Sequence, residues 1–223
     1  MTELKRYGVF LIPDPQTAAA VTRITGQLRA QYGLVSASAF PPHVTLVGSL
    51  PLDGDDAAPL AGVLDDVLEP RTSFPVSNAG IGWLGGSLIY DVHDRHGTPN
   101  APLVDLAATV DAAVRPLLSP IAPGTLAADV RESNRWYGHL SLASHDLEAR
   151  PELREEVRAY AEGLGVSVPP EFDARVIAVY EFRHSDWSGP WWIDLHWTHL
   201  HSWRLPYGPD RTSVEDHDID PIS

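Results

Sequence analysis

The chain has 223 residues, 43% of them hydrophobic, which is enough for one compact domain or two small lobes with an apolar core. Its 30 acidic and 16 basic residues give a formal net charge of −14, the wrong sign for a protein that grips a long nucleic acid through its phosphates. The sequence contains no cysteine, which excludes disulfides, thiolate nucleophiles and Cys-ligated metal sites.

The first half of the chain is predicted to run from a strand through two helices and a short strand to a hairpin. Asp14-Pro15 marks the start of the first helix, because Asp suits an N-cap and proline suits the first helical position. The remaining elements follow from apolar periodicity and turn residues. In order, we expect a strand at 6–12, a helix that ends near 33, a strand at 43–47, a helix at 60–68 and hairpin strands at 74–84 and 87–93.

The second half repeats this order of elements. We expect a helix at 103–117, a strand at 136–143, a helix at 153–164 and hairpin strands at 172–183 and 191–205. The repeat predicts an α+β fold of two pseudosymmetric lobes, each an antiparallel sheet with helices on its outside, around a central groove. Residues 1–207 would form one domain with lobes at roughly 1–95 and 100–207, between which strands can exchange, followed by an acidic tail at 208–223.

Two of the expected strands carry a histidine that is followed two residues later by a hydroxyl side chain. Alternate residues of a strand share a face, so His43 and Thr45 point one way while the aliphatic residues between and after them point the other. The same alternation places His139 and Ser141 together on one face of the second strand. This arrangement suits a functional site better than a core.

The pattern His-x-Ser/Thr is weak by itself, because it occurs four times in the sequence. One further copy, at 96–98, lies in an expected turn, where no strand alternation fixes the side chains. The other, at 196–198, lacks an aliphatic residue at its fourth position and has no counterpart in the first lobe. The copies at His43 and His139 stand out through their aliphatic alternation and their matching places in the two halves.

Two imidazoles with two hydroxyls can perform a phosphodiester displacement without a metal. One histidine takes a proton from the attacking oxygen and the other protonates the leaving oxygen, and both roles are available near neutral pH. The hydroxyls of Thr45 and Ser141 can donate to the phosphoryl oxygens that carry the developing charge. The order of the two motifs does not decide which histidine is the base.

At Pro42-His43-Val44-Thr45-Leu46 and Tyr137-Gly138-His139-Leu140-Ser141-Leu142 the chain resembles the 2H phosphoesterase superfamily, particularly its bacterial 2′-5′ RNA ligase and cyclic-phosphodiesterase branch. The likeness in element order extends over about residues 4–205. It implies that His43 and His139 are the catalytic pair and that Thr45 and Ser141 hold the phosphate, with serine in place of the commoner threonine. It also implies a metal-independent phosphodiesterase without a cofactor, acting on a 2′,3′-cyclic phosphate or a 2′-5′ phosphodiester of RNA ends or small nucleotides.

Two neighbours of the second motif are further candidates for contact with the substrate. Tyr137 is expected on the polar face of its strand, where it can stack on a base. Arg135 lies just before the strand and can reach a phosphate. The acidic body favours a small nucleotide or an RNA end as partner and not a long nucleic acid, and we expect a cytoplasmic monomer without a membrane segment.

Two other functions are compatible with the sequence. A nucleotide- or RNA-end-binding module could keep the same fold without cutting its ligand. The histidines at 196, 199 and 201 allow a metal-dependent hydrolase, since imidazole is a good zinc ligand. On a regular strand His199 and His201 would share a face and His196 would lie opposite, so three-fold ligation would need a bulge.

Overall fold

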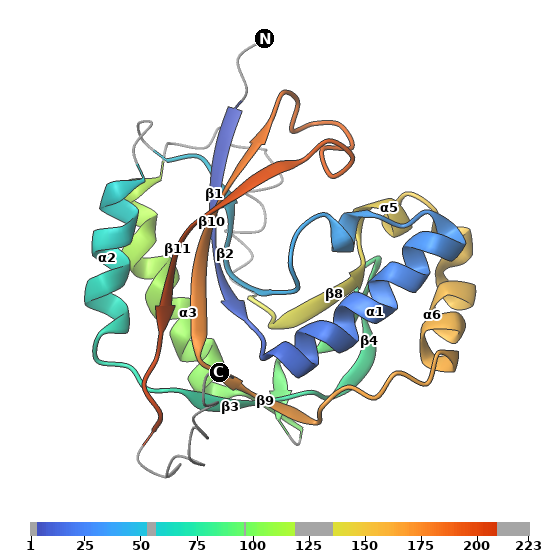
Figure 1. Ribbon diagram of the computed structural model, residues 1–223, viewed down its shortest axis with the longest axis horizontal. Coiled ribbons are helices and arrows are strands. Elements are labelled where there is room, and N and C mark those ends of the chain that lie inside the picture. The colour runs from blue at the N-terminus through green and yellow to red at the C-terminus, as the bar shows by residue number, and fades with distance from the viewer. Residues whose placement is uncertain (1–3, 53–56, 96, 119–135, 209–223) are drawn as a thin grey trace, which may run out of the picture.

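The structure, a computed structural model, describes residues 4–52, 57–95, 97–118 and 136–208 (Figure 1). The sequence features at His96, Arg135 and the tail beyond 208 lie outside the described residues. Within the described part, five α-helices accompany antiparallel strands, which confirms the predicted α+β class. None of the helices described there is long and apolar enough to cross a membrane.

The elements follow one another in the order given by their labels in Figure 1. Their bounds are β1 Leu4–Ile12, α1 Pro15–Tyr32, β2 Val44–Leu50, α2 Ala58–Leu68, β3 Phe74–Ser77, β4 Gly80–Leu84, β5 Ser87–Asp91, β6 Asp94–Arg95, β7 Thr98–Pro99, α3 Ala101–Val114, β8 His139–Ala143, α5 His145–Glu148, α6 Arg154–Gly163, β9 Glu171–Ala174, β10 Val176–His184 and β11 His196–Arg204. Three 3₁₀ turns lie at Ser36–Ser38, Arg115–Leu117 and Pro151–Leu153.

Helix α1 begins and ends where the sequence predicts. The Asp14 carboxylate accepts the backbone N–H of Thr17 at 2.7 Å, and Pro15 occupies the first helical position. The helix ends at Gly33, which adopts a left-handed conformation with φ of 67° that a side chain would disfavour.

Seven strands form one antiparallel sheet in the order β11-β10-β1-β2-β8-β5-β4. The hairpin β10–β11 from the second half of the chain pairs with β1, and the hairpin β4–β5 from the first half pairs with β8. The two motif strands, β2 and β8, therefore become neighbours in the middle of the sheet. They are joined by the single residue pair Val44–Leu140, so the paired stretch between these two strands is short. The predicted pseudosymmetry of the two halves stays a prediction.

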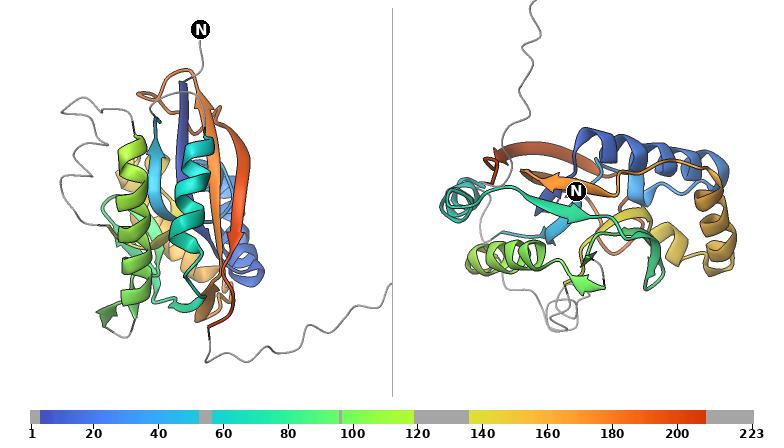
Figure 2. Two further views of the ribbon diagram at one scale, coloured as in Figure 1. Left: turned by 90° about the vertical axis from the view of Figure 1, so that its left-hand side faces the viewer. Right: turned by 90° about the horizontal axis from the view of Figure 1, so that it is seen from below.

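Helices cover the sheet in two groups (Figures 1 and 2). Helices α2 and α3 lie side by side over the part that contains β1, β2 and β10, while α1, α5 and α6 lie beside β8. The main apolar core packs between the sheet and these helices, and the aliphatic residues of both motif strands belong to it: Val44, Leu46, Leu140 and Leu142. Because neighbouring strand residues point to opposite faces, the histidines and hydroxyls of the motifs are left on the other face.

Several predicted boundaries differ from the structure. The strand expected at 74–84 is two strands, and β3 pairs with β9 in a separate small sheet. Strand β8 begins at His139 and not at 136, and β11 begins at His196 and not at 191. The short helix α5 was not predicted. These differences arise because strand partners, which local sequence does not specify, decide where a strand begins and ends.

Candidate active site

The two His-x-Ser/Thr motifs lie next to each other on one face of the sheet. Val44 of β2 pairs with Leu140 of β8 in antiparallel orientation. Continuing this register by one residue in each direction puts His43 across from Ser141 and Thr45 across from His139. Each histidine therefore has the hydroxyl of the other motif as its cross-strand neighbour.

All four motif side chains line one cavity of about 260 Å³. Its other walls are mainly aromatic and hydroxyl-bearing side chains, namely Phe10, Ser36, Phe40, Ser87, Ser144, His145, Phe182, Trp187 and Trp191, with Ala37 and Gly48. No lysine, arginine or carboxylate is among these lining residues, all of which belong to the described part of the chain. An anion in this cavity would be held by imidazoles and hydroxyls.

His43 is fixed by two aromatic rings and one backbone carbonyl. Its Nδ1 lies 2.8 Å from the carbonyl oxygen of Pro41. The ring of Phe40 stacks on the imidazole with centroids 4.2 Å apart, and the ring of Phe10 meets it edge-on at 4.7 Å. Phe10 can take this position because residue 8 is glycine, since a Cβ there would collide with the Phe10 ring.

His139 has the matching backbone contact on the second strand. Its Nδ1 lies 2.9 Å from the carbonyl oxygen of Tyr137. Tyr137 precedes His139 by two residues, as Pro41 precedes His43. Gly138 allows the chain to pass close to a ring, because a Cβ there would lie 2.9 Å from Trp136. The indole N–H of Trp136 donates to the carbonyl oxygen of Thr45 at 2.8 Å, which ties the two motifs together.

The hydrogen bonds of the two histidines determine which nitrogen faces the cavity. A carbonyl oxygen only accepts, so Nδ1 of each ring carries the hydrogen. The Nε2 atoms are then the ones available for proton transfer. Burial among aromatic rings lowers the pKa of His43 from 6.5 to about 4, with a smaller lowering from the charge of His139. Burial also lowers the pKa of His139, and the nearby carboxylate of Asp91 works in the opposite direction.

Tyr137 precedes β8 and does not line the cavity. Its hydroxyl donates to Asp91 Oδ2 at 2.5 Å, and its ring stacks on His93 with centroids 4.4 Å apart. Burial, followed by the bond to Asp91, raises the pKa of Tyr137 to about 12. The residue thus holds Asp91, which lies on β5 directly opposite His139 of β8. Its predicted contact with the substrate stays a prediction, as does that of Arg135.

The histidines of β11 do not share a face as expected, because the strand is irregular at Leu200. His199 pairs with Tyr180 and His201 pairs with Val179, so the extra residue between them turns the two rings to opposite faces. His199 contacts the Tyr180 ring and lies 2.7 Å from the hydroxyl of Ser202, and His201 contacts Trp203. Among the described residues, no three His, Asp or Glu side chains are grouped as metal ligands would be.

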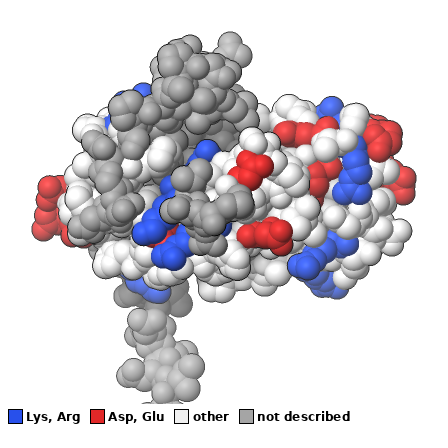
Figure 3. Space-filling model, turned by 90° about the horizontal axis from the view of Figure 1, so that it is seen from above, with Lys and Arg blue, Asp and Glu red and all other residues white. Residues whose placement is uncertain are grey.

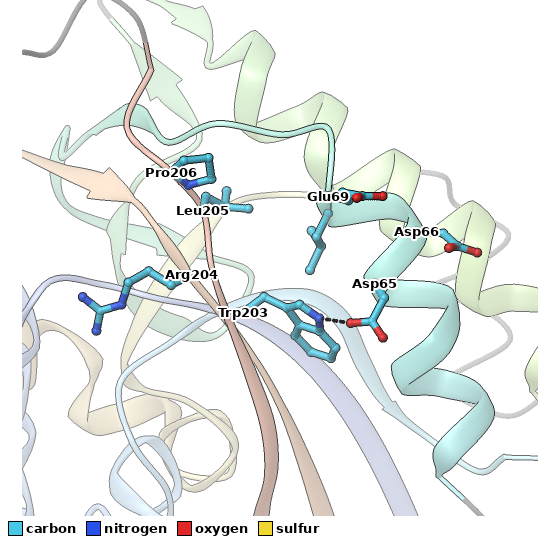
Figure 4. Close-up of a pocket in the computed structure, with 8 residues that line it drawn as sticks. Asp65, Asp66, Glu69, Trp203, Arg204, Leu205 and Pro206 are labelled. Carbon is cyan, nitrogen blue, oxygen red and sulfur yellow. Dashed lines mark hydrogen bonds between the residues drawn. The ribbon is translucent and has the colours of Figure 1, made fainter.

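A second cavity, of about 430 Å³, lies between α2 and the end of β11 (Figure 4). Three carboxylates line it, from Asp65, Asp66 and Glu69, and the indole of Trp203 donates to Asp65 at 2.6 Å. Arg204 is the one cation in its lining. An anionic substrate would be repelled there, so the cavity at the paired motifs is the better phosphate site.

The charged side chains visible in Figure 3 are of both signs and interspersed, and they form no continuous basic stripe on the part of that face drawn in colour. Binding along a nucleic-acid backbone needs such a stripe. The coloured part of this face therefore offers no track for a long strand.

A scan against protein-family models and a search of curated proteins found no match. Solved structures do match. TT0787 of Thermus thermophilus is 16% identical, with 91% of this chain and 98% of that chain covered and a TM-score of 0.54. A protein described as a phosphoesterase is 15% identical, with 91% and 99% covered and a TM-score of 0.51. LigT of E. coli, crystallised with 3′-AMP, is 16% identical, with 92% and 99% covered and a TM-score of 0.50.

The chain has the LigT-like phosphoesterase fold. The resemblance to the 2H phosphoesterase superfamily is thereby confirmed at the level of the fold, and at these identities the likeness concerns the fold alone.

Sequence reasoning missed most of the walls of this cavity. Phe10 comes from β1, which pairs with the motif strand β2, and Phe182 comes from β10, which pairs with β1; neither pairing is readable from the sequence. Ser144 and His145 directly follow the second motif strand, so their position in the chain was a signal that could have found them. Trp187 and Trp191 lie between β10 and β11, in a connection that carries no sequence motif.

Proposed function

We propose that the chain is a metal-independent phosphodiesterase that acts on a 2′,3′-cyclic phosphate or a 2′-5′ phosphodiester of an RNA end or small nucleotide. The observation that carries the proposal is the Val44–Leu140 pairing, which brings two histidines and two hydroxyls from distant parts of the chain to one cavity. Acid/base catalysis by two imidazoles requires this proximity.

The surroundings of the two histidines favour His43 as the base in the direction of hydrolysis. The aromatic pocket keeps His43 neutral, so its Nε2 can take a proton from water. Burial lowers the pKa of His139 as well, but Asp91 opposes this lowering, and a bound phosphate adds a second negative charge nearby. His139 would then carry the proton that the leaving oxygen needs.

In the proposed step, the water oxygen attacks phosphorus while its proton passes to Nε2 of His43. The bond from phosphorus to one ribose oxygen breaks, and that oxygen receives the proton from Nε2 of His139. Thr45 and Ser141 donate to the nonbridging oxygens, whose charge grows as phosphorus becomes five-coordinate. His43 and His139 then return to their first protonation states by exchange with solvent.

The aromatic walls support a nucleotide as the substrate. Trp187, Trp191 and Phe182 offer flat surfaces of the kind on which bases stack. LigT, which has this fold, has been crystallised with 3′-AMP. A nucleoside with one phosphate fits a cavity of this size better than a longer chain does.

The test is hydrolysis of 2′,3′-cyclic nucleotides and 2′-5′-linked dinucleotides in the presence of EDTA. We expect His43→Ala and His139→Ala each to lower kcat/KM by about 10²–10⁴-fold. His199→Ala is the matched control, because this histidine lies outside the cavity lining. Full turnover in both cavity variants would refute the mechanism, and loss of wild-type activity with EDTA would indicate a metal-dependent hydrolase.

A binding module of the same fold is the second candidate, since the aromatic cavity can hold a nucleotide without cutting it. It would bind 3′-AMP in calorimetry and turn over no member of the substrate panel. Turnover that depends on His43 excludes it.

A further inference from the structure

Two serines form a second polar wall of the cavity, apart from the paired motifs. Ser36 comes from the 3₁₀ turn that follows α1, and Ser144 directly follows β8. Both line the cavity, and their hydroxyl oxygens are 2.9 Å apart. The proposed mechanism uses neither of them.

The carboxylate of Asp146 holds this wall from behind. Asp146 is only 8% exposed. Its Oδ2 accepts the backbone N–H groups of Val35 and Ser36 at 2.5 and 2.9 Å, and its Oδ1 accepts the Ser36 hydroxyl at 2.6 Å. A carboxylate accepts and does not donate, so the one hydroxyl hydrogen of Ser36 is directed to Asp146.

This anchoring fixes the direction of the bond between the two serines. Because Ser36 has no second hydrogen to give, Ser144 must be the donor in the 2.9 Å contact. The hydrogens of both hydroxyls are then used within the protein. What the wall presents to the cavity is oxygen lone pairs, and therefore hydrogen-bond acceptors only.

We propose that Ser36 and Ser144 recognise a hydrogen-bond donor on the substrate, and that this donor is the exocyclic amino group of a nucleobase. Asp146 is a positioning residue that keeps the two hydroxyls as acceptors. The inference rests on the proposed function in that it takes a nucleotide as the substrate. A wall that only accepts hydrogen bonds favours the amino group of a base, which donates, over the carbonyl group of a base, which accepts. A ribose hydroxyl both donates and accepts, so the wall does not discriminate against it.

The position of the wall suits this reading. Ser144 is three residues beyond Ser141, so at the usual rise of a strand their Cα atoms are about 10 Å apart, roughly the length of one nucleoside. Trp191 lines the same part of the cavity, since its ring lies 5.2 Å from that of His145, and the Trp187 ring is 5.7 Å further on. A base stacked on these rings would present its edge to the serines.

Cytosine and uracil give the sharpest test, because they have similar shapes but carry an amino group and a carbonyl oxygen at the same ring position. We expect the wild-type protein to prefer 2′,3′-cyclic CMP over 2′,3′-cyclic UMP by about tenfold in kcat/KM, since the uracil oxygen would face acceptors without a hydrogen between them. Ser144→Ala removes one acceptor and should bring the ratio towards one.

Asp146→Asn should shift the preference towards uracil. The asparagine oxygen can still accept the backbone N–H groups, while its amide N–H₂ donates to the Ser36 oxygen. The Ser36 hydrogen is then free for Ser144, whose own hydrogen turns to the cavity. Ser38→Ala is the matched control, because that serine lies in the same turn and bonds to Val35 O at 3.0 Å without lining the cavity. Thermal unfolding shows whether each variant is folded.

Calorimetry with 3′-CMP and 3′-UMP separates this inference from the proposed catalysis. Tighter binding of 3′-CMP without turnover would support base recognition and refute the catalysis. Turnover that depends on His43 but shows equal kcat/KM for the two cyclic nucleotides would refute base recognition alone. A cytosine preference that Ser144→Ala leaves unchanged also refutes it, as does failure of both nucleotides to bind. If Asp146→Asn unfolds the protein, the wild-type ratio and Ser144→Ala still decide.

Discussion

Replacing Phe40 by alanine should raise the pKa of His43. The Phe40 ring stacks on the imidazole at 4.2 Å and excludes water from one of its faces. Burial is the largest cause of the lowered pKa, because the charged imidazolium is poorly solvated among apolar rings. Phe10 remains in contact with His43 in the variant, so we expect a partial return towards 6.5.

The expected rise is about one pKa unit, from about 4 towards 5, since one of the two contacting rings is removed. At pH 5 the protonated fraction of His43 would then grow from about a tenth to about half. If His43 is the base, kcat/KM should fall with acid near pH 5 in the variant and near pH 4 in the wild type, because this profile reports the pKa values of the free enzyme.

The same shift has a consequence for stability. The folded pKa of His43 lies below its unfolded value, so the protonated form is disfavoured only in the folded protein. The stability that neutral His43 contributes to the folded protein is fully present above about pH 6.5. It is lost as the pH falls towards 4. In Phe40→Ala this acid-induced loss should be smaller by about 1.4 kcal/mol for one unit of pKa.

The pKa can be measured by NMR titration of the histidine side chains, with His43→Asn to assign the resonance among the ten histidines. Phe74→Ala is the matched control, because that ring packs on the main core away from the cavity. A wild-type His43 that titrates near 6.5, or one whose pKa is the same in Phe40→Ala, would contradict the reasoning.

Three further substitutions test the frame around His139. Gly138→Ala should lower the free energy of unfolding in urea by about 1–3 kcal/mol and should lower kcat/KM, because its Cβ would lie 2.9 Å from the Trp136 ring. A variant as stable as the wild type would disprove this close packing. Asp91→Asn should lower the pKa of His139 further in an NMR titration, since the carboxylate raises it, and a higher value would be inconsistent with that role. Tyr137→Phe removes one hydrogen bond and should lower the free energy of unfolding by about 1 kcal/mol, while kcat/KM should change less than about twofold. A tenfold loss of kcat/KM would indicate that Tyr137 contacts the substrate.

Local sequence patterns were sufficient to single out the four motif residues that meet in one cavity, but not the residues that surround them. Strand alternation placed His43 with Thr45 and His139 with Ser141 on one face, and all four line the same cavity. The same reasoning failed at β11, where an extra residue at Leu200 puts His199 and His201 on opposite faces and not on the shared face expected. A bulge depends on the partner strand, so periodicity along one strand cannot reveal it.

The sequence by itself determined the longer helices, the order of helices and strands along the chain and the polar face of each motif strand, because these properties follow from residues close together in the chain. Only the tertiary structure decided that β2 and β8 are neighbours, and that Phe10, Phe40 and Ser36 complete the cavity around them. Strand order depends on the packing of the whole core, to which residues far apart in the chain contribute together. The protonation state of His43 and the direction of the Ser36–Ser144 bond depend in turn on those neighbours.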